Sequence, residues 1–292
     1  MKQSKSFVRS LVLTVLATAA AGATTVSGAD WKTAPVSPVT NPVFFEDPHI
    51  RTEIRPIFLY HNLDENFLAG EGRAILAAAQ LRWAVNDRLA VIATKDGYVD
   101  IELDDAPALS HSGWADLAFG LKYALIRNDE HQFILTPGLT FEIPTGDDEV
   151  FQGNGDGEWN PFVSAAKGWG NFRMLGNFGG RIPNNQEEET AQLHYSLQVD
   201  YNVCPWFVPF VALNAFTVLT EGENPLPLDE EGFDLINFGA PNAGGHTQAA
   251  AGVGFRSRLH KNAELGFAYE RGLDGGDGFF DDRFTLDLIV HF

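Results

Sequence analysis

The sequence predicts an all-β fold, a transmembrane antiparallel up-and-down β-barrel of about 12 strands. Three observations lead to this prediction. Apolar and polar residues alternate along many segments, the chain ends on such a segment at an aromatic residue, and the connections between segments alternate between short and long. The most apolar stretch after the N-terminal region is 204–219, and its prolines at 205 and 209 argue against a membrane-spanning helix.

The last ten residues show the alternation most clearly. Apolar side chains share one face and polar or charged side chains share the other: Phe284, Leu286, Leu288, Val290 and Phe292 against Arg283, Thr285, Asp287 and His291. A tilted strand of this length crosses a bilayer, and its period of two places lipid on one side and a polar lumen on the other. A half-buried strand of a soluble sandwich is the alternative, so the pattern has to recur. We expect the terminal Phe292 to be recognised by the barrel-insertion machinery.

The N-terminus has the features of an export signal. Lys2, Lys5 and Arg9 precede a short apolar stretch, 11–21, and small residues at 27–29 precede Asp30. We therefore expect a signal peptide at 1–29, a Pro-rich N-terminal segment at 30–50 and an outer-membrane barrel at 51–292. The prolines make 30–50 extended rather than helical. It lies either in the lumen as a plug or in the periplasm as a lead-in, and the sequence leaves both open.

Composition narrows the class of protein further. The chain carries 20 Lys and Arg against 39 Asp and Glu, a formal net charge of −19, which excludes nucleic acid as a partner. The single cysteine, Cys204, excludes an intramolecular disulfide framework. Much of the acid lies in the expected long loops, where it forms either a solvated rim or a set of ligands for divalent cations that bridge to the anionic outer leaflet. We favour the solvated rim and expect no metal site and no cofactor.

The two-residue period recurs along the whole chain. The expected strands are 51–63, 74–85, 89–98, 115–125, 133–143, 159–167, 172–182, 192–202, 207–218, 248–256, 263–270 and 283–292. The short connections are 86–87, 127–131, 168–170, 204–206 and 260–262, and the long ones are 64–73, 99–113, 145–158, 183–190, 219–246 and 273–282. Short and long strictly alternate, as expected for a bacterial barrel with both termini in the periplasm. A soluble sandwich has no reason to sort its loops in this way.

The inward phase of these strands gives the candidate solute path. Its residues are Arg55, Arg82, Asp116, Lys122, Glu142, Arg173, His194, Asp200, Phe210, Phe216, Arg256, Glu270 and Asp287. Charges of both signs occur in similar number, so they either pair and satisfy one another or line a narrow channel. The inward phase of 207–218 is apolar instead. It suits a partly apolar or aromatic solute, or packing of the N-terminal segment.

Three stretches carry a resemblance to a known family. The run from Ser112 to Tyr123 (SGWADLAFGLKY), the run LTPGL beginning at Leu135 and the run FEIPTGD beginning at Phe141 resemble outer-membrane barrels grouped under the MetA pathway of phenol degradation. The similarity extends from about Gly113 to the C-terminus, and its motifs are strand and loop patterns. The resemblance implies an outer-membrane barrel, often labelled a transporter, and identifies no substrate.

The leading hypothesis is passive passage of a small solute, aromatic or partly apolar, through a monomeric barrel surrounded by outer-membrane lipid and lipopolysaccharide. A non-conducting structural or adhesive barrel is the alternative. A third hypothesis is an outer-membrane lipid hydrolase that uses His194 and Ser196, because this spacing resembles the His-x-Ser of outer-membrane phospholipase A. The residues that follow, Leu197 and Gln198, depart from that enzyme's Asn-Gly, and the inward phase aims both side chains into the lumen. We therefore expect no enzymatic activity.

Overall fold

A computed structural model describes residues 37–64, 71–225, 228–273 and 279–292. The expected signal peptide and residues 30–36 lie outside these ranges. The strands are β1 (Glu53–Leu63), β2 (Gly72–Ala84), β3 (Leu89–Lys95), β4 (Tyr98–Leu103), β5 (Ser112–Trp114), β6 (Leu117–Tyr123), β7 (Ile126–Asn128), β8 (Phe133–Ile143), β9 (Glu158–Trp169), β10 (Phe172–Pro183), β11 (Gln192–Tyr201), β12 (Val208–Val218), β13 (Thr247–His260), β14 (Ala263–Gly272) and β15 (Phe280–His291). In the described part of the chain, no helix is long and apolar enough to cross a membrane.

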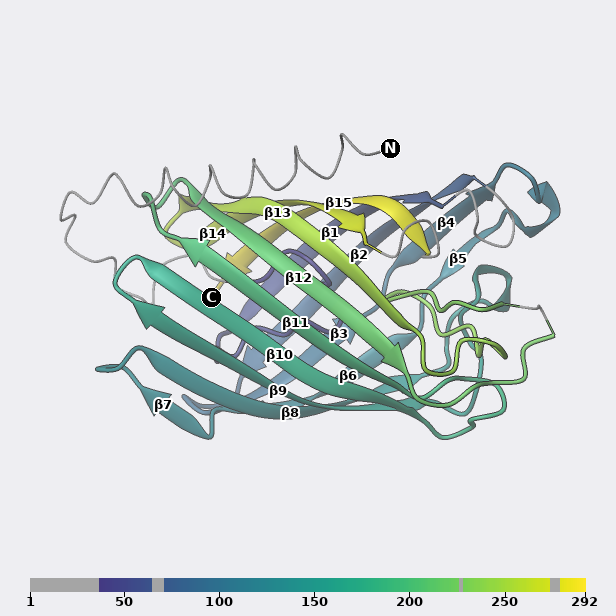
Figure 1. Ribbon diagram of the computed structural model, residues 1–292. Helices are drawn as coiled ribbons and strands as arrows, with labels where there is room; N and C mark the ends of the chain where they lie inside the picture. Colours follow the sequence, from purple (N-terminus) through teal and green to yellow (C-terminus); the bar gives the residue numbers. More distant parts are fainter. Residues whose placement is uncertain (1–36, 65–70, 226–227, 274–278) are drawn as a thin grey trace.

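The strands form one closed antiparallel barrel, as the sequence predicts (Figure 1). Closure comes from β1, which pairs with β15 on one side and β2 on the other. Two positions in the wall are interrupted: β3 and β4 both pair with β2, and the following position consists of β5, β6 and β7. Counting each interrupted position once gives twelve strands in the ring. Closure leaves the sheet without a free first or last strand, which suits a membrane, where exposed sheet edges are unfavourable.

Side chains alternate across this wall as the two-residue period requires. On β6, Leu117, Phe119 and Leu121 are about half exposed and face outward, whereas Ala118 and Lys122 are buried in the interior. The outward face is therefore apolar and matches lipid, and the charged residues lie inside. The short connections and the C-terminus lie at one end of the barrel and the long connections at the other (Figure 1).

The prediction that residues 99–113 form a long loop is wrong. The region 99–113 continues the sheet above the break at Asp96 and Gly97, as β4 and β5. Its inward residues Val99, Ile101 and Leu103 are buried and apolar, whereas Asp100 and Glu102 occupy outward positions. Outward carboxylates hide the strand pattern, because the prediction of a membrane strand rests on an apolar lipid-facing side. They fit a strand that extends beyond the bilayer into water.

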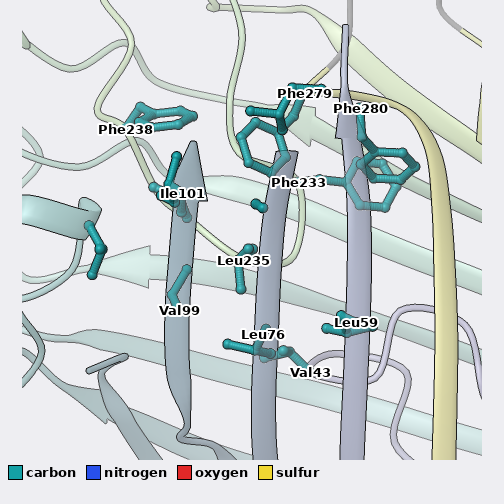
Figure 2. Close-up of a cluster of buried hydrophobic side chains, with 14 of the residues drawn as sticks. Val43, Leu59, Leu76, Val99, Ile101, Phe233, Leu235, Phe238, Phe279 and Phe280 are labelled. Carbon is teal, nitrogen blue, oxygen red and sulfur yellow. The ribbon is translucent and has the colours of Figure 1, made fainter. Parts of the chain in front are cut away.

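Two segments that belong to no strand fill the barrel. Residues 37–50, which we call the plug segment, lie inside the wall (purple in Figure 1). The connection between β12 and β13 folds inward at the end that carries the long loops. Figure 2 shows its residues Phe233, Leu235 and Phe238 near wall residues on β1, β2 and β4. The interior of this barrel is therefore packed with protein and contains no wide aqueous pore over the described residues.

Candidate functional site

The plug segment is clamped to the wall by a buried carboxylate. Glu46 accepts two hydrogen bonds from Arg82, at 2.9 and 2.6 Å, and one from Lys122 Nζ, at 2.7 Å. Lys122 also donates to the carbonyl of Asp47 at 2.6 Å. A charge removed from water needs a partner of opposite sign, so the segment's carboxylate and the two wall cations stabilise one another, and Glu53 lies a further 3.6 Å from Arg82.

A second clamp holds the start of the plug segment. Asp287 lies between Arg55 and Arg256 and accepts a hydrogen bond of 2.8 Å from each. The same two guanidinium groups donate to backbone carbonyls of the segment, Arg55 to Pro38 at 2.7 Å and Arg256 to Ser37 at 2.9 Å. The wall thus offers the segment a preformed pair of cations, already held in place by one carboxylate.

The plug segment is proline-rich and extended except for a hydrogen-bonded turn at residues 41–46, so the expectation of an extended segment holds only in part. Outside this turn its carbonyls have no helix or sheet partners. Wall side chains supply the missing donors. Gln80 donates to the carbonyl of Pro42 at 2.8 Å and Thr136 to that of Pro48 at 2.7 Å. The segment is therefore bound along its length, in the manner of an internal ligand.

Above the plug segment the middle of the lumen is apolar, and buried ion pairs of the wall border it. A buried cluster joins Val43 and Phe44 at the top of the plug segment to the wall of β1, β2 and β4 and to the infolded loop (Figure 2). We call this cluster the vestibule. The vestibule has the composition of a protein core, although it lies where a porin has its polar channel.

Aromatic rings run through the vestibule in an unbroken series, which we call the aromatic ladder. It begins in the loop after β8, passes through the loops before β13 and β15, and ends on the plug segment. The distances between successive ring centroids are 5.3 Å for Phe151–Phe238, 5.9 Å for Phe238–Phe279, 6.0 Å for Phe279–His61, 5.4 Å for His61–Phe280, 5.3 Å for Phe280–Phe233, 4.6 Å for Phe233–Phe216 and 5.7 Å for Phe216–Phe44. All lie in the range over which aromatic pairs attract.

Two arginines face rings of this ladder. Arg181 lies 4.9 Å from the centroid of Phe44, and Arg283 lies 5.0 Å from that of Phe280. Each is also fixed by a buried carboxylate: Arg181 by Glu158 at 2.8 Å and Arg283 by Glu270 at 2.8 Å. A cation held over a ring attracts the face of the ring, so these positions favour aromatic side chains and aromatic solutes alike.

A carboxylate in the infolded loop shapes the roof of the vestibule. Glu231 accepts hydrogen bonds from the backbone amides of Phe238 and Ala240, at 2.6 and 2.8 Å, and from the Thr190 hydroxyl at 3.0 Å. Burial nevertheless raises the pKa of Glu231 above its usual value, against the effect of these donors. In the neighbouring loop, burial and the adjacent Glu158 raise the pKa of Glu189 to about 8.

All thirteen residues of the expected solute path are buried inside the barrel. Five charged ones, Arg55, Arg82, Lys122, Arg256 and Asp287, form the two clamps described above. Phe210 packs against Val39 of the plug segment, whereas His194 and Phe216 both contact Phe44. The apolar stripe of β12 thus packs partly on the segment and partly in the vestibule.

The other charged residues of the expected solute path form ion pairs or hydrogen bonds with residues of the wall and its loops. Arg173 pairs with Asp200 at 2.7 Å, Glu142 with Lys95, and Glu270 with Arg283. Asp116 accepts hydrogen bonds from the backbone amides of Thr145, Gly146 and Gly153 at 2.8 to 2.9 Å. It therefore organises the loop after β8 and faces no open path.

Several interior residues escaped the sequence analysis. Lys95 follows a β-bulge after Ala93 that reverses the inward phase of β3, so a strict two-residue count places its side chain outside. Arg181 and Glu158 do follow the inward phase of β10 and β9 and could have been found. Phe44 and Phe233 lie outside the strands, where periodicity carries no information.

The hydrolase alternative finds little support in the geometry. His194 Nε2 bonds to Asn160 Oδ1 at 2.8 Å, whereas the Ser196 hydroxyl accepts a hydrogen bond from Asn41 of the plug segment at 3.0 Å. Both residues are buried inside the barrel, away from lipid. Over the described ranges, no group of three or more His, Cys, Asp or Glu side chains is placed to hold a metal ion.

Comparisons with known proteins agree with this architecture. A family model described as "Putative MetA-pathway of phenol degradation" matches residues 72–286, and so includes β2, which precedes the stretches that carry the resemblance. An outer membrane channel from Pseudomonas putida is similar in structure, with a TM-score of 0.62 at 17% identity over 88% of this chain and 100% of that chain. This likeness shows the fold.

Weaker structural similarities carry no argument. The KdgM porin has a TM-score of 0.48 at 8% identity, over 82% of this chain and 99% of its own. Outer membrane phospholipase A from Escherichia coli has a TM-score of 0.40 at 10% identity, over 87% of this chain and 97% of its own. No curated protein sequence matches the chain.

Proposed function

The chain belongs to the family described as the putative MetA pathway of phenol degradation, and from this premise we propose that it mediates passive passage of a small aromatic or partly apolar solute across the outer membrane. The solute enters among the long loops and moves down its own concentration gradient. The barrel fold and the similarity to an outer membrane channel support a role in passage.

The aromatic ladder carries this proposal. A polar solute that entered the vestibule would lose its hydration without gaining hydrogen bonds, which is unfavourable. An aromatic solute can replace one ring contact by another as it moves, so each step exchanges similar interactions. The ladder therefore supports selectivity for rings over sugars or ions of the same size.

A sealed structural barrel is the second candidate function. The plug segment and the paired charges favour it, because they close the lower lumen to water and ions. The two candidates differ in two respects: a sealed barrel needs no continuous ladder between the outer loops and the plug segment, and it moves no solute.

Uptake by intact Gram-negative cells that lack their own general porins tests the proposal. We expect cells that make this protein to take up ring-labelled phenol faster than cells without it, and to take up labelled arabinose no faster. Equal stimulation of both solutes would indicate a general pore, and stimulation of neither would indicate a sealed barrel.

We also propose that residues 1–29 direct export, that Phe292 is recognised by the insertion machinery, and that the barrel is a monomer in lipid and lipopolysaccharide. The 82% exposure of Phe292 and the outward apolar side chains of the wall support the last two points. The mass of the mature protein tests whether residues 1–29 are removed on export. The yield of a Phe292→Ser variant in the outer membrane tests recognition of Phe292. The mass of the detergent-purified protein tests whether the barrel is a monomer.

A further inference from the structure

The barrel wall contains a gap in its hydrogen-bonded ladder. On the side facing β3 and β4, β2 pairs with β4 through Gly72 to Ala77 and with β3 through Leu81 to Ala84. In the described pairings, residues 78–80 have no ladder partner on that side. The opposite edge of the gap is the break between β3 and β4, at Asp96 and Gly97.

Side chains patch this gap. Asp96 accepts a hydrogen bond of 2.9 Å from the backbone amide of Ala79, and Gln80 donates one of 2.6 Å to the carbonyl of Thr94. Backbone groups at membrane depth must be satisfied, which explains why these two polar side chains occur in the wall. A side chain can release its partner by rotating about its own bonds, whereas a ladder hydrogen bond breaks only if a strand moves.

A pocket of about 600 Å³ opens at the gap on the lipid-facing side. Its lining includes Ala77, Ala79 and Gly97, together with the exposed ring of Trp114. Gly97 has a φ of +121°, and a Cβ there would lie 2.9 Å from that of Ala78, so a side chain would both strain the backbone and close the space. Small residues, alanine and glycine, thus make up about half of the lining.

The same gap borders the vestibule on its inner side. Ala78, which lines the pocket, packs against the vestibule cluster, and Ala115, which also lines it, belongs to that cluster. Ala78 and Ala115 therefore border both the apolar interior and the lipid-facing pocket. Below the vestibule, the plug segment and its charged clamps stand between an apolar solute and the periplasm.

We propose that this gap is a lateral portal through which a small aromatic or apolar solute passes from the vestibule into the hydrocarbon region of the membrane. The inference rests on the proposed function and adds the route. The occupant is the solute itself, because the pocket lining is mostly apolar and shares Ala78 and Ala115 with the vestibule. Gln80 also donates to Pro42 of the plug segment, so the wall patch and the plug are held by one side chain.

A matched pair of substitutions tests the portal. Ala77→Trp places a large ring in the pocket, and Ala251→Trp makes the same change on β13, where Ala251 pairs with the lipid-facing Leu213. We expect A77W to reduce phenol uptake to that of cells without the protein and A251W to leave it unchanged. Heat-dependent gel mobility of both variants verifies that each barrel is folded.

A disulfide between the plug segment and the wall provides the complementary test. Thr40→Cys and Gly252→Cys bring two sulfurs into reach, since a Cβ at Gly252 would lie 2.7 Å from Thr40 Cγ2. Cys204→Ser removes the native thiol. With the plug fixed, the portal still operates, so oxidised cells should take up phenol as reduced cells do.

The outcomes separate the two proposals. Uptake that survives A77W but stops in the oxidised disulfide variant would place the route along the barrel axis and overturn the portal alone. If A77W takes up phenol as the wild type does, the portal is overturned whatever the disulfide variant shows. A lipid acyl chain would then be the occupant of the pocket. Wild-type cells that take up no phenol would overturn the proposed function and the portal together.

Discussion

Arg82 on the barrel wall holds Glu46 of the plug segment through two hydrogen bonds, and both side chains are buried. The pair links the filling of the lumen to its wall, and Glu46 also neutralises Lys122. Lys122 would lose its carboxylate partner without Glu46, so we expect this link to help keep the lower lumen closed.

Glu46→Gln should loosen the plug segment. The substitution leaves Lys122 without its carboxylate and Arg82 with only Glu53, at 3.6 Å, and breaking a buried pair in this way typically costs about 3–5 kcal/mol. We expect single-channel openings in a planar bilayer to become larger or more frequent than in the wild type. Glu102→Gln is the matched control, because Glu102 pairs with Arg73 in an exposed position. Identical records for E46Q and the wild type would show that this clamp does not close the lumen.

The T40C/G252C disulfide, made in a Cys204→Ser background, should silence whatever ion conductance the wild type shows. Ions require a hydrated path, and such a path exists only when the plug segment leaves the charged lower lumen. We expect few openings under oxidising conditions and restoration after a reductant is added. Openings that persist in the fully oxidised protein would mean that ions bypass the plug segment.

Phe216→Leu tests whether rings, rather than apolarity alone, carry the solute. Phe216 joins Phe233 to Phe44 in the ladder, and leucine preserves the apolar character while it removes the ring. We expect uptake of phenol to fall several-fold, with cyclohexanol uptake affected less. Phe119→Leu, at a lipid-facing position, should change neither rate. Equal losses for phenol and cyclohexanol in F216L would argue against ring exchange.

Opening should depend on pH through Glu189. Burial raises the pKa of this loop carboxyl to about 8, whereas in an undocked, solvated loop it returns to about 4.3. Docking of the loop that carries Glu189 is therefore most favourable at a pH below about 4.3, the pKa of the solvated carboxyl, and weakens as the pH rises toward 8. We expect passage of phenol to increase between pH 5 and pH 8 in proteoliposomes whose outer leaflet is lipopolysaccharide.

Glu189→Gln is the control for this pH dependence, because an amide does not titrate. The variant should show a smaller change in passage over the same pH interval. If the wild type and E189Q respond to pH alike, Glu189 is not the group that controls loop docking.

The strands of the barrel follow from the sequence because a two-residue period is a local property of the chain. The terminal segment from Arg283 to Phe292 illustrates this, since β15 covers nearly all of it. Lys95 shows the limit: one bulge reverses the phase, and no composition rule locates that bulge. Asp100 and Glu102 show a second limit of the prediction, because a strand that extends beyond the membrane has no need of an apolar outward face.

The filling of the barrel did not follow from the sequence. Glu46 and Lys122 are 76 positions apart, and the chain gives no sign that they meet. Phe233 likewise lies in an acidic stretch, next to Glu231 and Asp234, that looks like an exposed loop. Long-range packing decides these contacts, so the choice between a plug and a lead-in stayed open until the structure placed residues 37–50 in the lumen.

The position of a bound aromatic probe tests the central claim most directly. We would soak crystals of the protein in 4-bromophenol and locate bromine by its anomalous diffraction. The account predicts bromine beside Phe216 or Phe233 in the vestibule, and a second site beside Gly97 in the wall gap. Bromine found only on the outer lipid-facing surface, or only among the charged clamps around Arg82, would contradict it.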